Sequence, residues 1–330
     1  MQIGAGIWIL NSRTMSNLEF REVKTREDWE LAVSIRNLCS TYSPGTVEQA
    51  LESQSLLPEG AIAKRRLVER EGVLVGYFVV MEAFWLSSPG RFENRLFMVP
   101  EHETPELYDQ ILAETERMSV ELGAKKTCYW ERTIRPDAMA CMAKRGYAET
   151  QRNPQGFVSP GQVDYSAFQE KLDLVTAEGF TIKSLEELSK EDPLWERKYY
   201  DLNMDVMADV PLPDPFAPIP YEDFLKDIKT MDLHCIMVAI SKEGDWAALS
   251  AMDHNRVNPK VGNTLLTGVR RAFRRKSLAT AVKVVLMQRA KNLGIEKIYT
   301  DNEEDNPMFL LNKQLGFVEE FQYVCFEREV

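Results

Sequence analysis

Hydrophobic periodicity in the last hundred residues predicts alternating strands and helices. Three apolar runs have the length and composition of strands. They span His234–Ile240, Ala247–Asp253 and Asn263–Val269. A helix from about Leu278 to Leu293 follows, because its apolar residues recur near helical spacing and Gly294 is placed to end it. Beyond it, "KIYTD" predicts a strand, residues 307–315 predict a helix, and "QYVCFE" predicts a final strand.

The same order of elements occurs twice along the chain. "ELGAKKTCYW" resembles "NLGIEKIYTD", with Gly123 and Gly294 171 residues apart. "CMAKRGYAET" resembles "LNKQLGFVEE", with Gly146 and Gly316 170 residues apart. Self-similarity at a nearly fixed spacing indicates a duplicated structural unit. We therefore expect two homologous domains.

The repeat divides the chain into four parts. We expect a disordered leader at 1–15, a first domain at 16–155, a linker at 156–177 and a second domain at 178–330. The junction contains "NPQGFVSPGQ", whose proline and glycine content is typical of a loop. A short amphipathic helix is expected at Tyr165–Ala177, ending at Gly179.

Composition and charge exclude several kinds of function. A net charge of −11, with 44% hydrophobic and 28% charged residues, fits a soluble globular protein and offers no general basic face for nucleic acid. Five cysteines without CxxC spacing and three histidines without HExxH predict reduced thiols and no metal site. The apolar run "GIWIL" is too short to cross a bilayer. We expect a cytoplasmic protein, monomeric or homodimeric, with no membrane partner.

A basic stretch interrupts this acidic chain. Five of the eight residues from Val269 to Lys276 are basic, and a predicted helix follows them. A helix N-terminus can hold a phosphate, because its first N–H groups are unpaired and its dipole favours an anion. Without an anion, positive side chains at that end are unfavourable. The alternative is a solvated charged run on the surface.

The residues around this stretch resemble the acetyl-CoA motif of the GNAT superfamily of N-acyltransferases. The motif reads (Gln/Arg)-x-x-Gly-x-(Gly/Ala) between a strand and a helix. Its counterparts here are Arg274, Arg275, Lys276, Ser277, Leu278 and Ala279. "TDNEEDNPMFLLNKQLGF" resembles a later segment of the same superfamily. The likeness covers about 230–325, the repeat extends it to the first half, and it is greatest to two-domain members of the mycothiol synthase type.

The resemblance implies an α/β fold of two tandem GNAT-like domains, each a mixed, mostly antiparallel sheet flanked by helices. It implies direct transfer from acetyl-CoA to a primary amine of a small molecule. The backbone of Thr267, Gly268 and Val269 would pair with the pantetheine arm, and the amides from Arg275 to Ala279 would hold the pyrophosphate. Asn306 would hydrogen-bond the pantetheine or the amine region, and Asn302 would lie near the thioester.

Two coenzyme-site residues depart from the superfamily pattern. Ser277 stands where the motif has glycine, although serine is a favoured helix N-cap and its hydroxyl could bond phosphate. Asn312, which we include among the coenzyme-binding residues, stands where relatives have a tyrosine that often protonates the leaving thiolate. An asparagine cannot serve as that acid.

The catalytic base is not identified by a motif. "WAALSAM" and "NTLLTGV" lack the glutamate that many relatives carry in the central strands. The substitutes near predicted strand ends are Asp253, His254, Asp301 and Glu303. We take His254, Asp301 and Asn302 as the catalytic candidates, with a solvated loop position as the alternative for each carboxylate and for the histidine.

The acceptor pocket of the superfamily implies a role for the proline-rich stretch between 199 and 228. Asp205, Asp209 and Asp214 could hold an ammonium group there, or lie on a polar surface loop. Tyr221 could line the pocket or pack in the core. We take Asp205, Asp209 and Tyr221 as acceptor-binding candidates.

The first half supplies a contrast to the basic loop. At an offset of 171, Arg274–Ser277 lie opposite Glu103–Glu106, which read "ETPE" and would repel phosphate. We therefore expect the first domain to keep the scaffold without the coenzyme motif. The main hypothesis is an acyl-CoA-dependent N-acetyltransferase. The alternatives are a non-catalytic acyl-CoA-binding sensor or interaction module, and a scaffold with no activity in either half.

Overall fold

A computed structural model describes residues 18–330, and the leader predicted at 1–15 lies outside that range. One twelve-stranded sheet runs through both halves in the order β1-β2-β3-β4-β5-β12-β6-β11-β10-β9-β8-β7. The strands of the first half are β1 (Leu18–Glu22), β2 (Ala63–Arg70), β3 (Val73–Met81), β4 (Arg91–Met98), β5 (Lys126–Arg132) and β6 (Ala148–Val158). Those of the second half are β7 (Thr181–Ser184), β8 (Ile236–Ile240), β9 (Trp246–His254), β10 (Val261–Val269), β11 (Lys297–Asp301) and β12 (Val318–Glu329).

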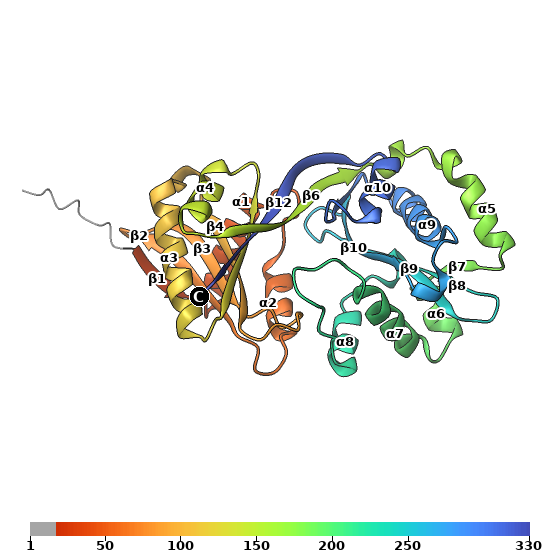
Figure 1. Cartoon of the computed structure of the whole chain (residues 1–330), viewed down its shortest axis with the longest axis horizontal. Coiled ribbons are helices and arrows are strands. Elements are labelled where there is room, and N and C mark those ends of the chain that lie inside the picture. Colours follow the sequence, from red (N-terminus) through yellow and green to blue (C-terminus); the bar gives the residue numbers. More distant parts are fainter. Residues whose placement is uncertain (1–17) are drawn as a thin grey trace, which may run out of the picture.

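Helices cover both faces of the sheet in each half (Figure 1). The first half has α1 (Arg26–Cys39), α2 (Val47–Ser55), α3 (Pro105–Glu121) and α4 (Pro136–Lys144). The second half has α5 (Gln169–Ala177), α6 (Leu185–Glu191), α7 (Trp195–Met207), α8 (Tyr221–Ile228), α9 (Leu278–Asn292) and α10 (Pro307–Gln314). Buried residues of α3 and α4 form one core with the first-half strands, and α1 packs on the other face. In the second half α9 covers one face, while α6, α7 and α8 cover the other.

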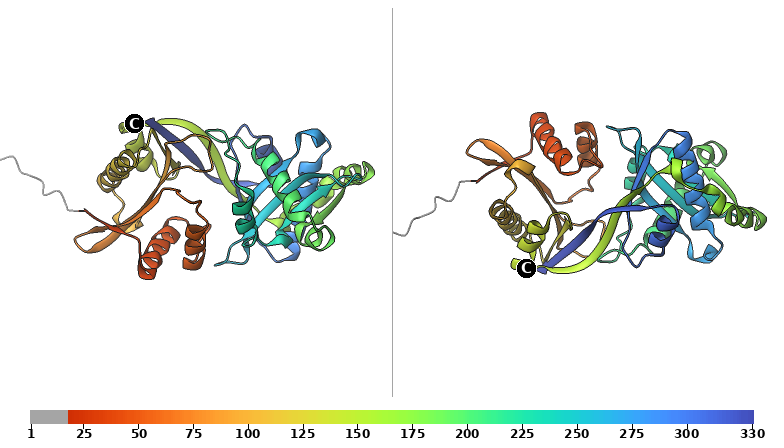
Figure 2. Two further views of the ribbon diagram at one scale, coloured as in Figure 1. Left: turned by 90° about the horizontal axis from the view of Figure 1, so that it is seen from below. Right: turned by 90° about the horizontal axis from the view of Figure 1, so that it is seen from above.

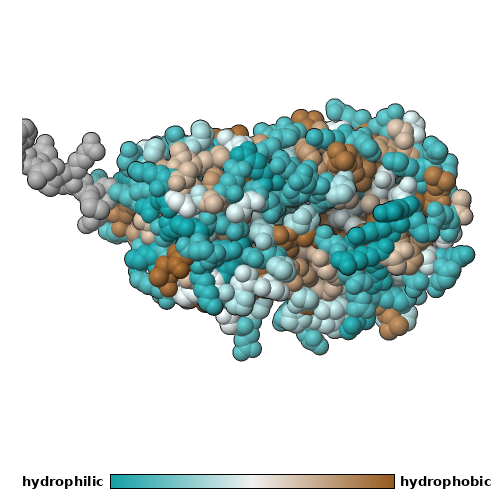
Figure 3. All heavy atoms as spheres, viewed as in Figure 1, coloured by the Kyte–Doolittle hydropathy of each residue, from teal (hydrophilic) through white to brown (hydrophobic). Residues whose placement is uncertain are grey.

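Local sequence explains where several helices begin. Thr25, Thr46 and Ser184 each precede a helix, and each side chain accepts a hydrogen bond from the backbone three residues later. The residue at that third position bonds back to the cap, which completes a capping box. The face of the molecule shown in Figure 3 is largely hydrophilic, with hydrophobic residues scattered over it. Within residues 18–330, no helix combines the length and the apolar character needed to cross a bilayer.

The sheet has the mixed, mostly antiparallel character that was predicted. All neighbouring strands pair antiparallel except β4 with β5 and β10 with β11, which are parallel. The two parallel pairs are short. β4 and β5 pair only along Arg91–Asn94, and β10 and β11 pair only along Val261–Asn263. Beyond those residues the two strands of each pair diverge, so each half contains an opening in the sheet.

The final strands of the two halves are exchanged. β12, from the end of the chain, inserts beside β5 of the first half, while β6 pairs with β11 of the second half. β6 and β12 also pair with each other and run together between the two lobes (Figure 2). A Cβ on Gly156 would lie 2.0 Å from the carbonyl oxygen of Val318, so only glycine allows β12 this close. Each half of the sheet is therefore completed by a strand of the other.

This exchange corrects the predicted loop at the domain junction. Residues 153–158, within "NPQGFVSPGQ", continue β6 rather than forming a loop. Pro154 is tolerated because β11 pairs with β6 only from Gln155 onward, so no β11 carbonyl needs the missing N–H of the proline. The predicted short helix follows as a 3₁₀ turn at Tyr165–Phe168 and α5.

Candidate coenzyme and acceptor site

The basic loop between β10 and α9 has an unusual backbone. Arg275 has φ 64° and Ser277 has φ 59°, and they are two of three non-glycine residues with positive φ in the described chain. Such angles are costly for L-residues and natural for glycine. The glycine of the resembled motif thus corresponds to a position that has a glycine-like conformation here. Ser277 stands at the N-cap of α9, but its side chain makes no capping hydrogen bond, unlike the expected serine cap.

The amides of this loop have no partner within the described chain. Between residues 18 and 330, no acceptor pairs with the N–H groups of Arg275 through Thr280. Four of them belong to Ser277 and the first turn of α9, where N–H groups are intrinsically unpaired. A backbone with left-handed residues at such a point forms an anion-binding concavity. The unpaired amides and the positive charge of this loop are therefore suited to binding a pyrophosphate group.

Two aspartates balance part of the positive charge of the loop. Asp209 pairs with Arg271 and Arg274, and Asp205 Oδ2 lies 2.7 Å from Arg270 Nε. Hydrogen bonding from Arg271 lowers the pKa of Asp209. Of the acceptor-binding candidates, Asp205 and Asp209 are therefore placed beside the basic loop. Arg275 has no ion-pair partner among the described residues, and it remains exposed.

The corresponding loop of the first half is built differently. One residue, Glu103, separates its 3₁₀ turn from the helix cap, whereas three residues occupy this place in the second half. Thr104 has an extended backbone, and its Oγ1 accepts from the Leu107 N–H at 3.2 Å. Pro105 has no N–H. The offset of 171 is therefore shifted by two residues at this point, and Thr104, not Glu106, lies opposite Ser277.

An open edge of β10 leads away from the basic loop. β10 pairs with β9 as far as Val269, but β11 leaves its other edge after Asn263. A register shift between Thr264 and Leu266 marks a bulge at the point where the strands diverge. The edge that carries Thr267, Gly268 and Val269 is thus free to pair with an extended chain, as an added strand would.

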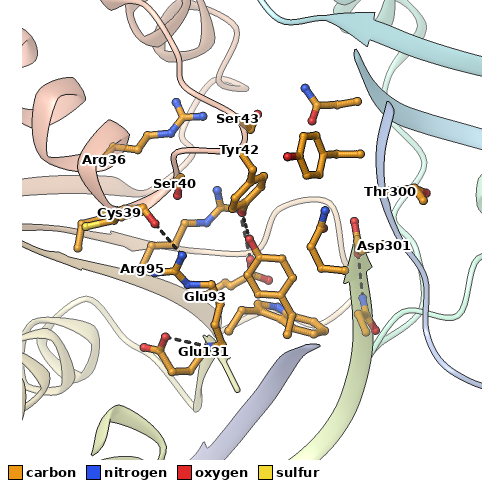
Figure 4. Close-up of a pocket in the computed structure, with 18 of the residues that line it drawn as sticks. Arg36, Cys39, Ser40, Tyr42, Ser43, Glu93, Arg95, Glu131, Thr300 and Asp301 are labelled. Atoms are coloured by element: carbon orange, nitrogen blue, oxygen red, sulfur yellow. Dashed lines mark hydrogen bonds and ion pairs between the residues drawn. The ribbon is translucent and has the colours of Figure 1, made fainter. Parts of the chain in front are cut away.

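A cavity of about 600 Å³ lies between the two halves (Figure 4). Both openings in the sheet face it, because Arg95 and Trp130 of the first half and Thr264 and Asp301 of the second line its walls. The proline-rich stretch also contributes, through Leu212 and Pro213. A cavity of this size suits a small-molecule ligand.

Asp301 ends β11 at one wall of the cavity. Its carboxyl is open to the cavity yet surrounded by protein, and this burial raises its pKa. Asn153, on the exchanged strand β6, donates to Asp301 Oδ2 at 3.2 Å. A carboxylate with a raised pKa is a better proton acceptor than an ordinary one.

The three candidate asparagines lie in α10 or in the segment that precedes it. Asn312 donates from Nδ2 to Oδ1 of Asn302 at 2.5 Å, joining α10 to the residue after β11. Asn312 is buried, and its Oδ1 has no protein partner in the described chain. Asn306 caps α10 by accepting from the Met308 N–H at 2.9 Å.

Two further candidates lie away from the cavity. His254, the last residue of β9, does not line the cavity, and its Nε2 is 2.9 Å from Cys235 Sγ and 3.2 Å from Asp232 Oδ2. These three ligand atoms lie close enough together to hold a metal, so the expected absence of metal stays a prediction. Tyr221, on α8, packs against Tyr200 with ring centroids 5.2 Å apart.

Several residues that line the cavity were not predicted from the sequence. The hydroxyl groups of Tyr42 and Tyr323 form a hydrogen bond in the cavity, and burial raises the pKa of Tyr323. Arg36 and Arg95 lie on the first-half side, opposite Asp301 (Figure 4). No motif marks these residues, and Tyr323 reaches the first half only through the exchanged strand β12.

Comparisons with known proteins bear on this fold. No family model matches the sequence, and no curated protein does. Among solved structures, a GCN5-related N-acetyltransferase from Sphaerobacter thermophilus aligns with a TM-score of 0.69 at 15% identity, covering 94% of this chain and 95% of that one. A tandem GNAT protein from the clavulanic acid biosynthesis pathway, without AcCoA, gives 0.71 at 14% identity, covering 95% and 98%. A GNAT-family acetyltransferase from Colwellia psychrerythraea gives 0.60 at 13% identity, covering 94% and 100%.

These likenesses extend over nearly the whole chain and include a protein with two GNAT units. The tandem character of that protein agrees with the duplicated order of elements in this chain. The chain therefore has the fold of the tandem GNAT N-acetyltransferases, which confirms the resemblance drawn from its sequence.

Proposed function

We propose that the chain is an N-acyltransferase that uses acetyl-CoA to acylate a primary amine of a small molecule, with the coenzyme bound to the second half. The observation that carries this proposal is the loop before α9. It combines two left-handed residues, unpaired amides and an excess of arginine. The first-half loop instead closes its helix with the Thr104 cap.

The second half offers a continuous path for the coenzyme. The amides from Arg275 to Ala279 would hold the pyrophosphate, assisted by the free charge of Arg275. The open edge of β10 from Val269 back to Thr267 would pair with the pantetheine arm. That edge leads toward the divergence point of β10 and β11, where Thr264 and Asp301 line the cavity.

The reaction would take place at the end of β11. Acetyl-CoA supplies an activated thioester carbonyl, and the amine nitrogen would form a bond to that carbon while the bond to sulfur breaks. CoA would leave as a thiolate that takes a proton from solvent. Asp301 would accept the proton that the amine loses, and its raised pKa supports that role. Asn312 keeps Asn302 oriented at the same strand end. Holding both reactants in one site supplies proximity.

One observation favours a second function, a non-catalytic acyl-CoA-binding protein. Asn312 stands where relatives of the resembled superfamily have a tyrosine, and it is buried and bonded to Asn302. A side-chain amide cannot donate a proton to a leaving thiolate. Such a protein would bind acetyl-CoA without releasing thiol.

Thiol release separates the two functions. The chain, acetyl-CoA and a panel of primary amines are mixed, and free CoA is measured with a thiol reagent. We expect amine-dependent release that falls strongly in Arg275→Glu, because the reversed charge repels phosphate. Lys229→Glu carries the same charge change on an exposed residue of the second half and should retain activity. Binding of acetyl-CoA without release by any amine would support the sensor, and no binding would refute both.

A further inference from the structure

We propose that the first half supplies an anion-binding subsite, formed by Arg36 and Arg95, and that the acceptor is therefore a primary amine that also carries a carboxylate or phosphate group. This inference rests on the proposed function. It gives a role to the half that lacks the coenzyme loop.

Arg36 is a half-buried cation without a counter-ion. It projects from α1 into the cavity, and no carboxylate of residues 18–330 pairs with it. Burial lowers its pKa, and the charge of Arg95 lowers it further. Removing a charge from water without a partner is costly, so such groups are normally paired or ligand-binding. The guanidinium of Arg36 is held close to the loop after α1, where a Cβ on Gly45 would lie 3.1 Å from its Nη1.

Two more arginines strengthen the positive wall. Arg95 lies on β4 just past the last residue that pairs with β5, and its only ion-pair partner in the described chain is Glu93, at 3.4 Å. Arg132 donates a hydrogen bond from Nη1 to the backbone oxygen of Cys39 at 2.6 Å. It has no ion-pair partner among residues 18–330. By contrast, Arg135 is neutralised by Glu131 at 3.0 Å and by Glu103. The cavity thus carries uncompensated positive charge on its first-half side.

The opposite wall carries the complementary charge. Asp301 stands across the cavity from Arg36 and Arg95, and Tyr42 lies between them (Figure 4). The hydroxyl group of Tyr42 is hydrogen-bonded to that of Tyr323. A ligand with an amine at one end and an anion at the other would match this arrangement. Its anion would replace the missing partner of Arg36, and its amine would lie beside the carboxyl of Asp301. Guanidinium groups pair well with carboxylate and phosphate, because their N–H groups match the oxygen geometry.

Matched amines test the subsite. Thiol release is measured for each amino acid against its neutral amide, and for phosphoethanolamine against ethanolamine, which distinguishes carboxylate from phosphate. We expect kcat/KM at least about tenfold higher for one anionic member than for its neutral partner, as one charge-assisted hydrogen bond predicts. In Arg36→Gln the KM for the anionic amine should rise about tenfold with little change in kcat, while the neutral amine and acetyl-CoA are unaffected. Arg36→Lys should restore part of the loss.

Arg26→Gln is the control, because it removes an exposed arginine from the same helix. A second readout needs no turnover. The melting temperature of the full chain is measured with each amine at millimolar concentration, and only anionic amines should raise it, in the wild type and not in Arg36→Gln. Equal responses to anionic and neutral amines, or equal loss of both in Arg36→Gln, would overturn the subsite. If the chain binds anionic amines but does not bind acetyl-CoA, the proposed function is refuted and the subsite is supported.

Discussion

Replacing Ser277 by glycine tests the geometry of the loop before α9. Ser277 has φ 59° and ψ 11°, and its side chain makes no capping hydrogen bond. A left-handed conformation costs an L-residue about 1–2 kcal/mol. Glycine adopts it freely but loses about 0.5–1 kcal/mol more backbone entropy on folding. Because no hydrogen bond is lost, we expect Ser277→Gly to raise the free energy of unfolding by about 0.5 kcal/mol.

Urea unfolding followed by tryptophan fluorescence measures this change. Thr104→Ala is the matched control at the other half's helix, where the Thr104 side chain does cap. That variant should lose about 1 kcal/mol. A similar loss in Ser277→Gly would show that the serine hydroxyl caps α9 and would refute the left-handed loop. The glycine variant should also bind acetyl-CoA at least as tightly, because it removes a side chain from the proposed pyrophosphate site.

Three further predictions concern the exchanged strands, the inter-half ion pairs and pH. Gly156→Ala should lose about 2–3 kcal/mol in urea unfolding, since its Cβ would meet Val318 at 2.0 Å, while Gly161→Ala, with nothing nearby, should be neutral. Arg91→Met removes the buried guanidinium that lies 2.7 Å from the half-buried carboxylate of Asp214 and 2.6 Å from that of Glu327, and it should cost about 3 kcal/mol by the same assay. Asp301→Asn should lower thiol release strongly, and the activity that remains should rise less with pH than that of the wild type.

The direction of the Asp301 effect on stability follows from its raised pKa. The folded state favours the protonated carboxyl, so the stability this group contributes is full below its unfolded pKa and is lost as pH rises through the folded pKa. At neutral pH the ionised carboxyl therefore lowers the stability of the folded state, and Asp301→Asn should melt at a higher temperature than the wild type. The difference should disappear below the ordinary carboxyl pKa. Identical melting curves at all pH values would contradict the raised pKa.

Local patterns were enough to predict most of the second half. The helix predicted from Leu278 is α9, and its last α-helical residue, Asn292, lies next to the predicted end at Leu293. The repeat is also visible in the structure, because α4 and α10 begin 171 residues apart and β6 and β12 begin 170 apart. Periodicity reports which face of an element is buried, and that information is local.

The exchange of β6 and β12 could not be predicted in this way. A strand shows the same alternation whichever neighbour it pairs with, and pairing with the other half leaves no local trace. The cavity escaped for the same reason, since Arg36 and Asp301 come from opposite halves of the chain. The offset of 171 was wrong by two residues at the start of α3 and α9. The second half has two extra loop residues before its helix, and these carry no periodic signal.

We propose that one half of this duplicated chain binds acetyl-CoA, through the loop before α9. Isothermal titration calorimetry of the full chain with acetyl-CoA tests it most directly, because it counts sites. We expect one site per chain, which is lost in Arg275→Glu and retained in Lys229→Glu. No binding, two sites per chain, or a single site whose affinity is unchanged in Arg275→Glu would contradict this proposal.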